Sequence, residues 1–124
     1  MPAEYDIDPT RGLVRTRAWG ELTDGDVLEY YRRLSVEPAF RPTYSQLCDL
    51  RAVTRIATTP ATLRDLARSK IFAPSSHRAF VTRPEADFGL ARMFQAFCEQ
   101  EGTTIGVFLQ LEEAEAWIGL RAES

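Results

Sequence analysis

Arginines cluster around a predicted helix start in the middle of the chain, where they could bind an anion. Two of them precede the segment Thr58-Thr59-Pro60 and two follow it: Arg51, Arg55, Arg64 and Arg68. Thr59 is a good N-cap, and Pro60 suits the first helical position because it lacks the amide hydrogen that would have no partner there. Free amides at a helix N-terminus attract anions, and arginines strengthen such a site. We therefore expect an anionic ligand or an acidic protein surface to bind near residues 51–68. The alternative is a solvated arginine face, or pairing with the acidic C-terminal third.

Nucleophiles and bases are too sparse to predict catalysis. His77 is the only histidine, and the adjacent Ser76 would point to the opposite face of a strand. Cys48 and Cys98 lie in apolar segments, which is typical of buried, reduced thiols. The glutamates of residues 112–115 fall in the first turn of a predicted helix, where the helix dipole stabilises negative charge. The sequence thus predicts no catalytic residue, no metal site and no cofactor.

Charge is unevenly distributed along the chain. The 124 residues carry a net charge of −3, which disfavours a general nucleic-acid binder. Residues 41–83 carry seven arginines, one lysine and two acids, whereas residues 84–124 carry two arginines and eight acids. No apolar run reaches the length of about 20 residues that spans a bilayer, and the acidic N-terminus lacks a signal-peptide pattern. We expect one domain over residues 1–124, without a transmembrane segment and in the cytoplasm.

Strands and helices are predicted to alternate along most of the chain. The expected elements are a hairpin turning at residues 8–12, a strand at 13–19, a helix from 23 to before 38, a strand at 46–50, a helix at 60–71, a strand at 77–82, a helix at 85–100, a strand at 104–109 and a helix at 111–120. The order ββαβαβαβα implies crossover connections. The predicted class is therefore α/β: a mixed five-stranded sheet with an N-terminal antiparallel hairpin, largely parallel otherwise, and about four helices.

The helical spacing of apolar residues predicts which faces pack on the sheet. A capping box of Thr23 and Asp26 should begin the first helix. The expected inward residues, helix by helix, are Val27, Leu28, Tyr31 and Leu34; Leu63, Leu66, Ala67 and Lys70 or Ile71; Leu90, Met93, Phe94, Phe97 and Cys98; and Ala114, Trp117 and Ile118. Four aromatic residues fit no inward stripe and would mark a partner or dimer face if exposed together: Trp19, Tyr30, Tyr44 and Phe72.

Several stretches in this order resemble the STAS superfamily, and most closely its SpoIIAA-like branch of small bacterial single-domain proteins. The stretches are Tyr5–Pro9 with Gly12–Val14, Leu22–Asp24, Asp49–Thr54, Phe88–Gln95 and Glu112–Trp117. The resemblance covers nearly the whole chain and implies the same α/β fold. In the anti-sigma factor antagonists of this superfamily, a strand reading Leu-Asp-Leu leads into a loop whose second serine a partner kinase phosphorylates. Thr59 falls at that phosphoacceptor position, and Thr58 falls at the serine before it.

The resemblance implies a non-enzymatic regulatory module that binds a protein partner or a second copy of itself. Ala57 stands where the family has an acid and Pro60 where it has a glycine, so capping alone is the competing interpretation of Thr59. The SpoIIAA-like branch is also similar in architecture to lipid-binding domains, which gives the alternative function. That alternative is a carrier or sensor of a small apolar or anionic ligand, held between sheet and helices. An apolar cavity would favour the carrier, and a flat, exposed Thr58-Thr59 surface without one would favour the module.

Overall fold

The computed structural model describes residues 2–84 and 86–123, and within them the elements follow the predicted order. They are β1 (Ala3–Asp8), β2 (Leu13–Thr23), α1 (Asp24–Ser35), β3 (Ser45–Ala57), α2 (Pro60–Ser69), β4 (His77–Val81), α3 (Ala86–Gln100), β5 (Thr104–Phe108) and α4 (Leu111–Glu123). The five strands form one sheet in the order β1-β2-β3-β4-β5. Strand β1 runs antiparallel to β2, and the other neighbours are parallel. The predicted mixed α/β sheet is confirmed.

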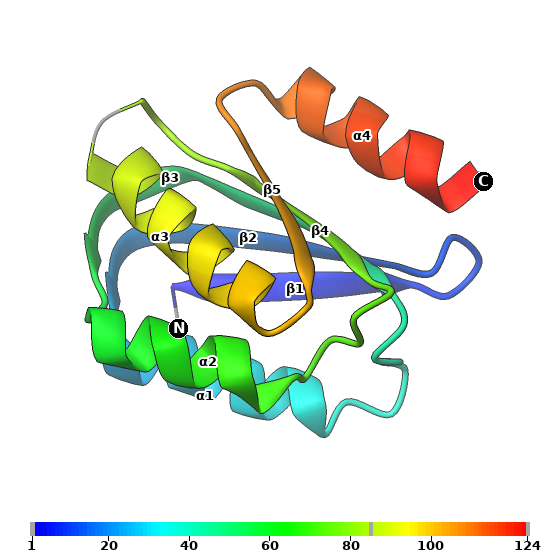
Figure 1. The fold of residues 1–124 in the computed structure, drawn as a ribbon, viewed down its shortest axis with the longest axis horizontal. Coiled ribbons are helices and arrows are strands. Elements are labelled where there is room, and N and C mark those ends of the chain that lie inside the picture. Colours follow the sequence, from blue (N-terminus) through cyan, green and yellow to red (C-terminus); the bar gives the residue numbers. More distant parts are fainter. Residues whose placement is uncertain (1, 85, 124) are drawn as a thin grey trace.

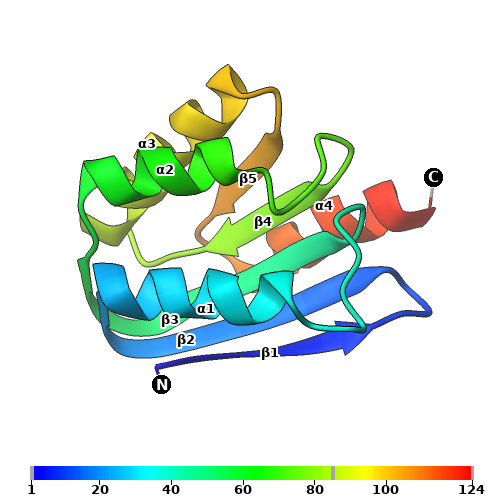
Figure 2. The same ribbon diagram turned by 90° about the horizontal axis from the view of Figure 1, so that it is seen from below.

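The sheet separates two helical layers of unequal size. Helices α1, α2 and α3 cover one face, and α4 packs against the other (Figures 1 and 2). The apolar cluster under the three helices is the larger one and draws on β1 to β5. The cluster under α4 contains a smaller set of buried residues: Leu13, Leu47, Ala79, Val81, Ala114 and Ile118. Strand β4 is buried along nearly its whole length because it lies between these two layers.

Helices α1 and α2 begin with the predicted N-caps. At α1, the Thr23 hydroxyl accepts from the Asp26 amide at 3.2 Å, and the Asp26 carboxylate accepts from the Thr23 amide at 3.0 Å. This is the predicted capping box. At α2, Pro60 is the first helical residue and the Thr59 hydroxyl accepts from the Thr62 amide at 3.4 Å. Local sequence therefore fixes where both helices begin.

Strand β3 is longer than predicted. The sequence indicated a strand over residues 46–50, whereas β3 continues to Ala57. The neighbouring β2 pairs with it from Leu13 opposite Ser45 to Thr23 opposite Ala57, so the extra residues have a partner for their backbone groups. The register shifts twice near Gly20, which has φ +68°. Such irregularities bend strands, and the ends of β2 and β3 curve toward the starts of α1 and α2 (Figure 1).

Two predicted core positions are wrong. Leu28 is 47% exposed and Met93 is 37% exposed. In α1 the buried stripe passes through Tyr30 in place of Leu28. A tyrosine is stable inside because its hydroxyl finds polar partners on the sheet beneath it.

The aromatic face that Trp19, Tyr30, Tyr44 and Phe72 would form if exposed together is absent from the part of the chain that the structure describes. Tyr30 and Phe72 are buried, 5% and 2% exposed. Trp19 and Tyr44 are half-buried. The four residues therefore do not form an exposed aromatic patch.

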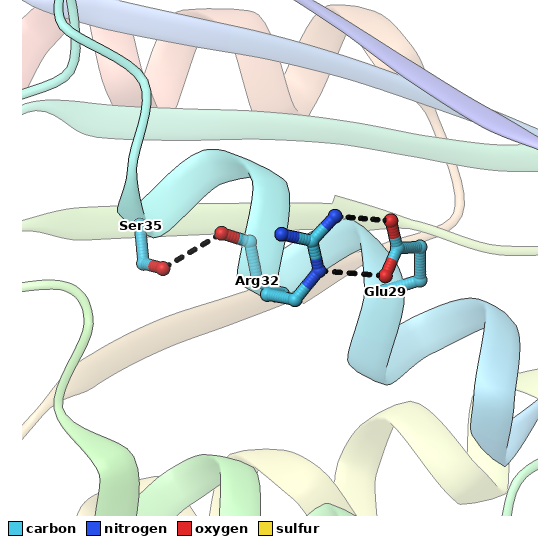
Figure 3. Close-up of polar contacts among 3 residues, drawn as sticks. All are labelled: Glu29, Arg32 and Ser35. Atoms are coloured by element: carbon cyan, nitrogen blue, oxygen red, sulfur yellow. Dashed lines mark hydrogen bonds and ion pairs between the residues drawn. The ribbon is translucent and has the colours of Figure 1, made fainter.

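The outer face of α1 is held by local polar contacts (Figure 3). The Arg32 guanidinium donates two hydrogen bonds to the Glu29 carboxylate, at 2.8 and 2.6 Å. The Ser35 hydroxyl donates to the Arg32 carbonyl at 2.8 Å. These groups are exposed and lie on the side of α1 that faces away from the sheet, so α1 is amphipathic.

Candidate functional site

A pocket lies between the sheet and the three helices of the larger layer. Its volume is about 100 Å³. The helical walls are mainly apolar, and their chief residues are Val27 and Tyr30 of α1, Leu63 and Leu66 of α2, and Leu90 and Phe94 of α3. Small side chains leave the space open: Ala18 of β2 and Ala91 of α3 both line the pocket. A larger apolar residue at either position would occupy part of this volume.

The floor of the pocket is a buried polar triad on β2, β3 and α1. The Gln46 side-chain amide donates to the Thr16 hydroxyl and to the Tyr30 hydroxyl, both at 3.0 Å. Thr16 and Tyr30 are also hydrogen-bonded to each other. All three line the pocket, and Gln46 is fully buried. Because every member is bonded to the others, the sheet can carry polar atoms in an otherwise apolar layer.

Behind this floor lies a buried arginine. Arg78 of β4 is 5% exposed. Its Nε donates to Gln46 Oε1 at 3.0 Å, and a terminal nitrogen donates to the Tyr31 hydroxyl. Its guanidinium carbon lies 4.2 Å from the centroid of the Phe72 ring and 5.4 Å from that of Phe80. Aromatic faces stabilise a desolvated cation, so hydrogen bonds and rings together surround the charge.

Burial controls the ionisation of the groups at the pocket. It raises the pKa of Tyr31, with Arg78 opposing this to a smaller extent. Burial likewise raises the pKa of Tyr30. Burial raises the pKa of the Cys48 thiol to about 12, with Arg78 again opposing the shift. At neutral pH these side chains are protonated, so the pocket offers hydroxyl and thiol groups and no thiolate nucleophile.

The structure separates the two threonines proposed as phosphoacceptors. Thr58 is buried, 6% exposed, and its hydroxyl donates to the Leu22 carbonyl at 3.4 Å. Thr59 is exposed at the N-terminus of α2. The Asp24 carboxylate accepts from the Thr59 amide at 2.8 Å and from the Thr59 hydroxyl at 3.0 Å. These bonds lower the pKa of Asp24, chiefly through the Thr59 amide, and they join the first turns of α1 and α2.

The four arginines predicted to form one anion site lie apart. Arg51 pairs with Asp49 at 2.8 Å, and Arg55 pairs with Glu21 at 3.2 Å. The other two lie on α2 and contact the region of α3: Arg64 stacks on Phe97, 4.7 Å from the ring centroid, and Arg68 lies 3.9 Å from Glu101. The structure therefore distributes these charges between two regions, and the pocket is lined by none of them.

The other residues considered for catalysis, His77 and Cys98, do not line the pocket. His77 packs edge-on against Trp117 of α4, with ring centroids 5.7 Å apart. Cys98 is buried, and burial raises the pKa of its thiol. Among the described residues, no three side chains of the metal-ligating types gather into a site. None of the helices described combines the length and apolar character needed to cross a membrane.

Sequence reasoning missed the polar residues at and behind the pocket floor. Arg78 was counted only among the seven arginines of residues 41–83, and Gln46 was assigned only to a strand. One signal was present: Arg78 lies inside a short apolar strand between two crossover helices. A central parallel strand has no solvent face, so a charged residue within it must be buried.

Comparisons with known proteins bear on the fold. No family model matches the sequence, and no curated protein matches it. Among solved structures, the chain is similar to an uncharacterized protein of the DUF3478 family with a SpoIIAA-like fold, from Shewanella loihica PV-4. The TM-score is 0.61 at 16% sequence identity, and the match covers 94% of this chain and 93% of that chain. The chain therefore has a SpoIIAA-like fold.

Proposed function

We propose that the chain is a non-enzymatic binding module whose ligand is a small apolar molecule held between the sheet and helices α1 to α3. The observation that carries the proposal is the apolar pocket of about 100 Å³. Ligand sites are typically concave and largely apolar, with a few polar groups that fix orientation. This pocket has that composition. It was also the feature expected to distinguish a carrier from a flat interaction surface.

The chemistry of the lining supports binding over catalysis. A general base works best with a pKa near the operating pH. The pKa values of Tyr30, Tyr31 and Cys48 are all raised by burial, which moves them further from neutrality. The pocket thus supplies a shape and a few hydrogen-bonding groups.

The volume of the pocket determines which small molecules can be used to measure binding. A dry apolar cavity of about 150 Å³ binds benzene, so a pocket of this size suits a molecule of about six carbon atoms. Each buried methylene contributes about 0.8 kcal/mol, so a six-carbon chain should bind with a dissociation constant on the order of 1 mM. Hexanol is therefore a suitable neutral probe, and amide NMR can follow binding at this affinity.

Blocking the pocket tests the proposal. Ala91→Phe places a ring at the lining, and it should weaken hexanol binding by about tenfold or more. Ala96→Phe is the matched control because Ala96 lies on the exposed side of the same helix, outside the lining. The proposal fails if hexanol shifts amides away from the pocket, or if both variants bind it equally well.

A second candidate function is a regulatory interaction module of the kind that the SpoIIAA-like resemblance implies. One observation favours it: Thr59 is exposed and its hydroxyl donates to Asp24 at 3.0 Å. A phosphate on Thr59 would remove that hydrogen bond and repel the Asp24 carboxylate, which would loosen the junction between α1 and α2. A partner protein could then distinguish the two forms.

Mass spectrometry of the protein purified from its own source cells tests this second candidate. Phosphate should be found on Thr59 and not on Thr58, which is the internal control because it is buried. Phosphate on neither residue would leave Thr59 with its capping role alone.

A further inference from the structure

We infer that the ligand of this pocket carries a carboxylate, which the donor-rich floor of Thr16, Tyr30, Tyr31 and Gln46 receives with Arg78 behind it. The inference rests on the proposed function, since it names the chemical class of the molecule that the pocket would hold. Three independent properties of the floor carry it: its charge, its count of hydrogen-bond donors and its position.

The charge of Arg78, behind the floor, has no counter-ion among the described residues. In the part of the chain that the structure describes, no carboxylate lies within ion-pair distance of the Arg78 guanidinium. Its hydrogen-bond acceptors are the neutral oxygens of Gln46 and Tyr31. A buried charge without a counter-ion is unfavourable, and aromatic rings offset only part of the cost. An anion near the floor would therefore be stabilised by this charge.

The floor also has more donors than acceptors. Gln46 uses both amide hydrogens on Thr16 and Tyr30. The hydrogen bond between Thr16 and Tyr30 uses only one of their two hydroxyl hydrogens. The Tyr31 hydroxyl oxygen accepts from Arg78, and its own hydrogen has no acceptor among the described residues. Two hydroxyl hydrogens are thus left to donate, and a carboxylate accepts at two oxygens.

The position of these donors is suitable for a ligand. Thr16, Tyr30, Tyr31 and Gln46 all line the pocket, whereas Arg78 lies behind Gln46 and Tyr31. A carboxylate that reaches the floor would accept from these hydroxyl groups, and Arg78 would act through the Tyr31 hydroxyl that it polarises. The burial that raises the pKa of Tyr31 keeps this hydroxyl a donor at neutral pH.

The remaining walls select the rest of the molecule. They are lined mainly by leucine, valine, alanine and phenylalanine side chains from α1 to α3 and the sheet. The acidic side chain of Asp26 also lines the pocket, and its carboxylate accepts from the Thr23 amide in the capping box. A compact acid with a short aliphatic or aromatic body matches the floor and the apolar walls, with its carboxylate at the floor and away from Asp26.

The experiment compares three probes with the same six-carbon chain: hexanoate, hexanol and hexylamine. Each is titrated into the whole protein at neutral pH and followed by amide NMR. Hexanoate should bind about tenfold more tightly than hexanol, and hexylamine should bind most weakly. The amide shifts should centre on β2, β3 and α1.

Two variants assign the effect to the floor. Gln46→Glu supplies a carboxylate that can pair with Arg78 and accept from the two hydroxyls. It should weaken hexanoate by about tenfold while changing hexanol by less than about twofold. Gln100→Glu is the matched control, since it adds the same charge at an exposed position. Tyr31→Phe removes one donor without adding charge, and should weaken hexanoate by about fivefold.

The outcomes separate the two proposals. If the unmodified protein binds hexanoate no more tightly than hexanol, the carboxylate inference is wrong while the pocket proposal stands. If Gln46→Glu and Tyr31→Phe both fold and keep the hexanoate preference, the floor does not recognise the anion. If none of the three probes shifts the amides of the lining, the pocket proposal itself is wrong.

Discussion

The two faces of the sheet are packed very differently. On the α4 side, a methyl group added at Gly106 would lie 2.7 Å from the Phe108 ring and 3.4 Å from Trp117. On the other side, the three helices leave a pocket of about 100 Å³. Protein interiors are normally close-packed. The α4 layer is close-packed at Gly106. Its own pocket is lined in part by the charged residues Arg11, Arg15 and Glu115. The α1 to α3 layer departs from close packing at the mainly apolar pocket where we propose binding.

Truncating one apolar side chain in each layer should give the largest difference. Val81 is fully buried in the α4 layer and lines neither of these pockets, and Val81→Ala should destabilise the protein by about 2 kcal/mol because it creates a new cavity. Val27 lines the existing pocket under α1 to α3, so Val27→Ala should cost less, about 1 kcal/mol. Urea denaturation measures both. Equal costs would contradict the comparison.

Adding volume should also cost more stability on the α4 side than at the pocket. Gly106→Val forces Phe108 and Trp117 to move and should destabilise the fold by about 2 kcal/mol. Ala91→Phe enters open space and should change stability by less than about 1 kcal/mol. Thermal unfolding of the two variants beside the unmodified protein checks this. The packing difference is refuted if Ala91→Phe is the more damaging change.

The junction between α1 and α2 should show a smaller effect. Thr59→Ala removes the N-cap and should cost about 1 kcal/mol, whereas Thr59→Ser should cost little. The pKa of Asp24 should rise toward its ordinary value, because it loses the Thr59 hydroxyl as a donor but keeps the Thr59 amide. Carboxyl NMR titration of Asp24 in both variants measures this shift.

The pH dependence of this junction has a definite sign. The folded-state pKa of Asp24 is lowered, so its contribution is fully present above the ordinary aspartate pKa. It should be lost as the pH falls through the folded-state value. Unfolding measured across the acid range should show this loss, and Asp24→Asn should remove it.

The outer surface of α1 should show the smallest effect. Arg32→Ala breaks an exposed ion pair with Glu29 (Figure 3), and such pairs contribute little to stability. The unfolding midpoint and the hexanol affinity should both stay close to those of the unmodified protein. The pKa of Glu29, which Arg32 lowers, should rise. A large loss of stability would mean that α1 depends on this pair more than its exposure implies.

Local signals in the sequence predicted most of the fold. The order of the strands and helices, the Thr23 capping box and the start of α2 at Pro60 all followed from short-range chemistry. The length of β3 did not, because residues 51–57 are held by pairing with β2, which is distant in sequence. The burial of Tyr30 in place of Leu28 also depends on distant partners, because the Tyr30 hydroxyl is hydrogen-bonded to Thr16 and Gln46 on the sheet.

The candidate site was much harder to predict. A cavity is a difference between the space that the helices enclose and the volume of the side chains that fill it, and neither is visible in a pattern of apolar residues. Arg78 has the same side chain as the surface arginines around it. Only its place on the central strand β4 makes it buried.

The bends in β2 and β3 have a consequence for how such a pocket can change. Leu22 and Ile56 line the pocket beyond the register shifts near Gly20, whereas Thr16 and Gln46 of the floor lie before them. The bend therefore positions the first pair of side chains separately from the second. A change at the bend that keeps the alternation of inward side chains should move Leu22 and Ile56 while the contacts at the floor are kept. The fold thus has separate structural determinants for ligand size and for ligand chemistry.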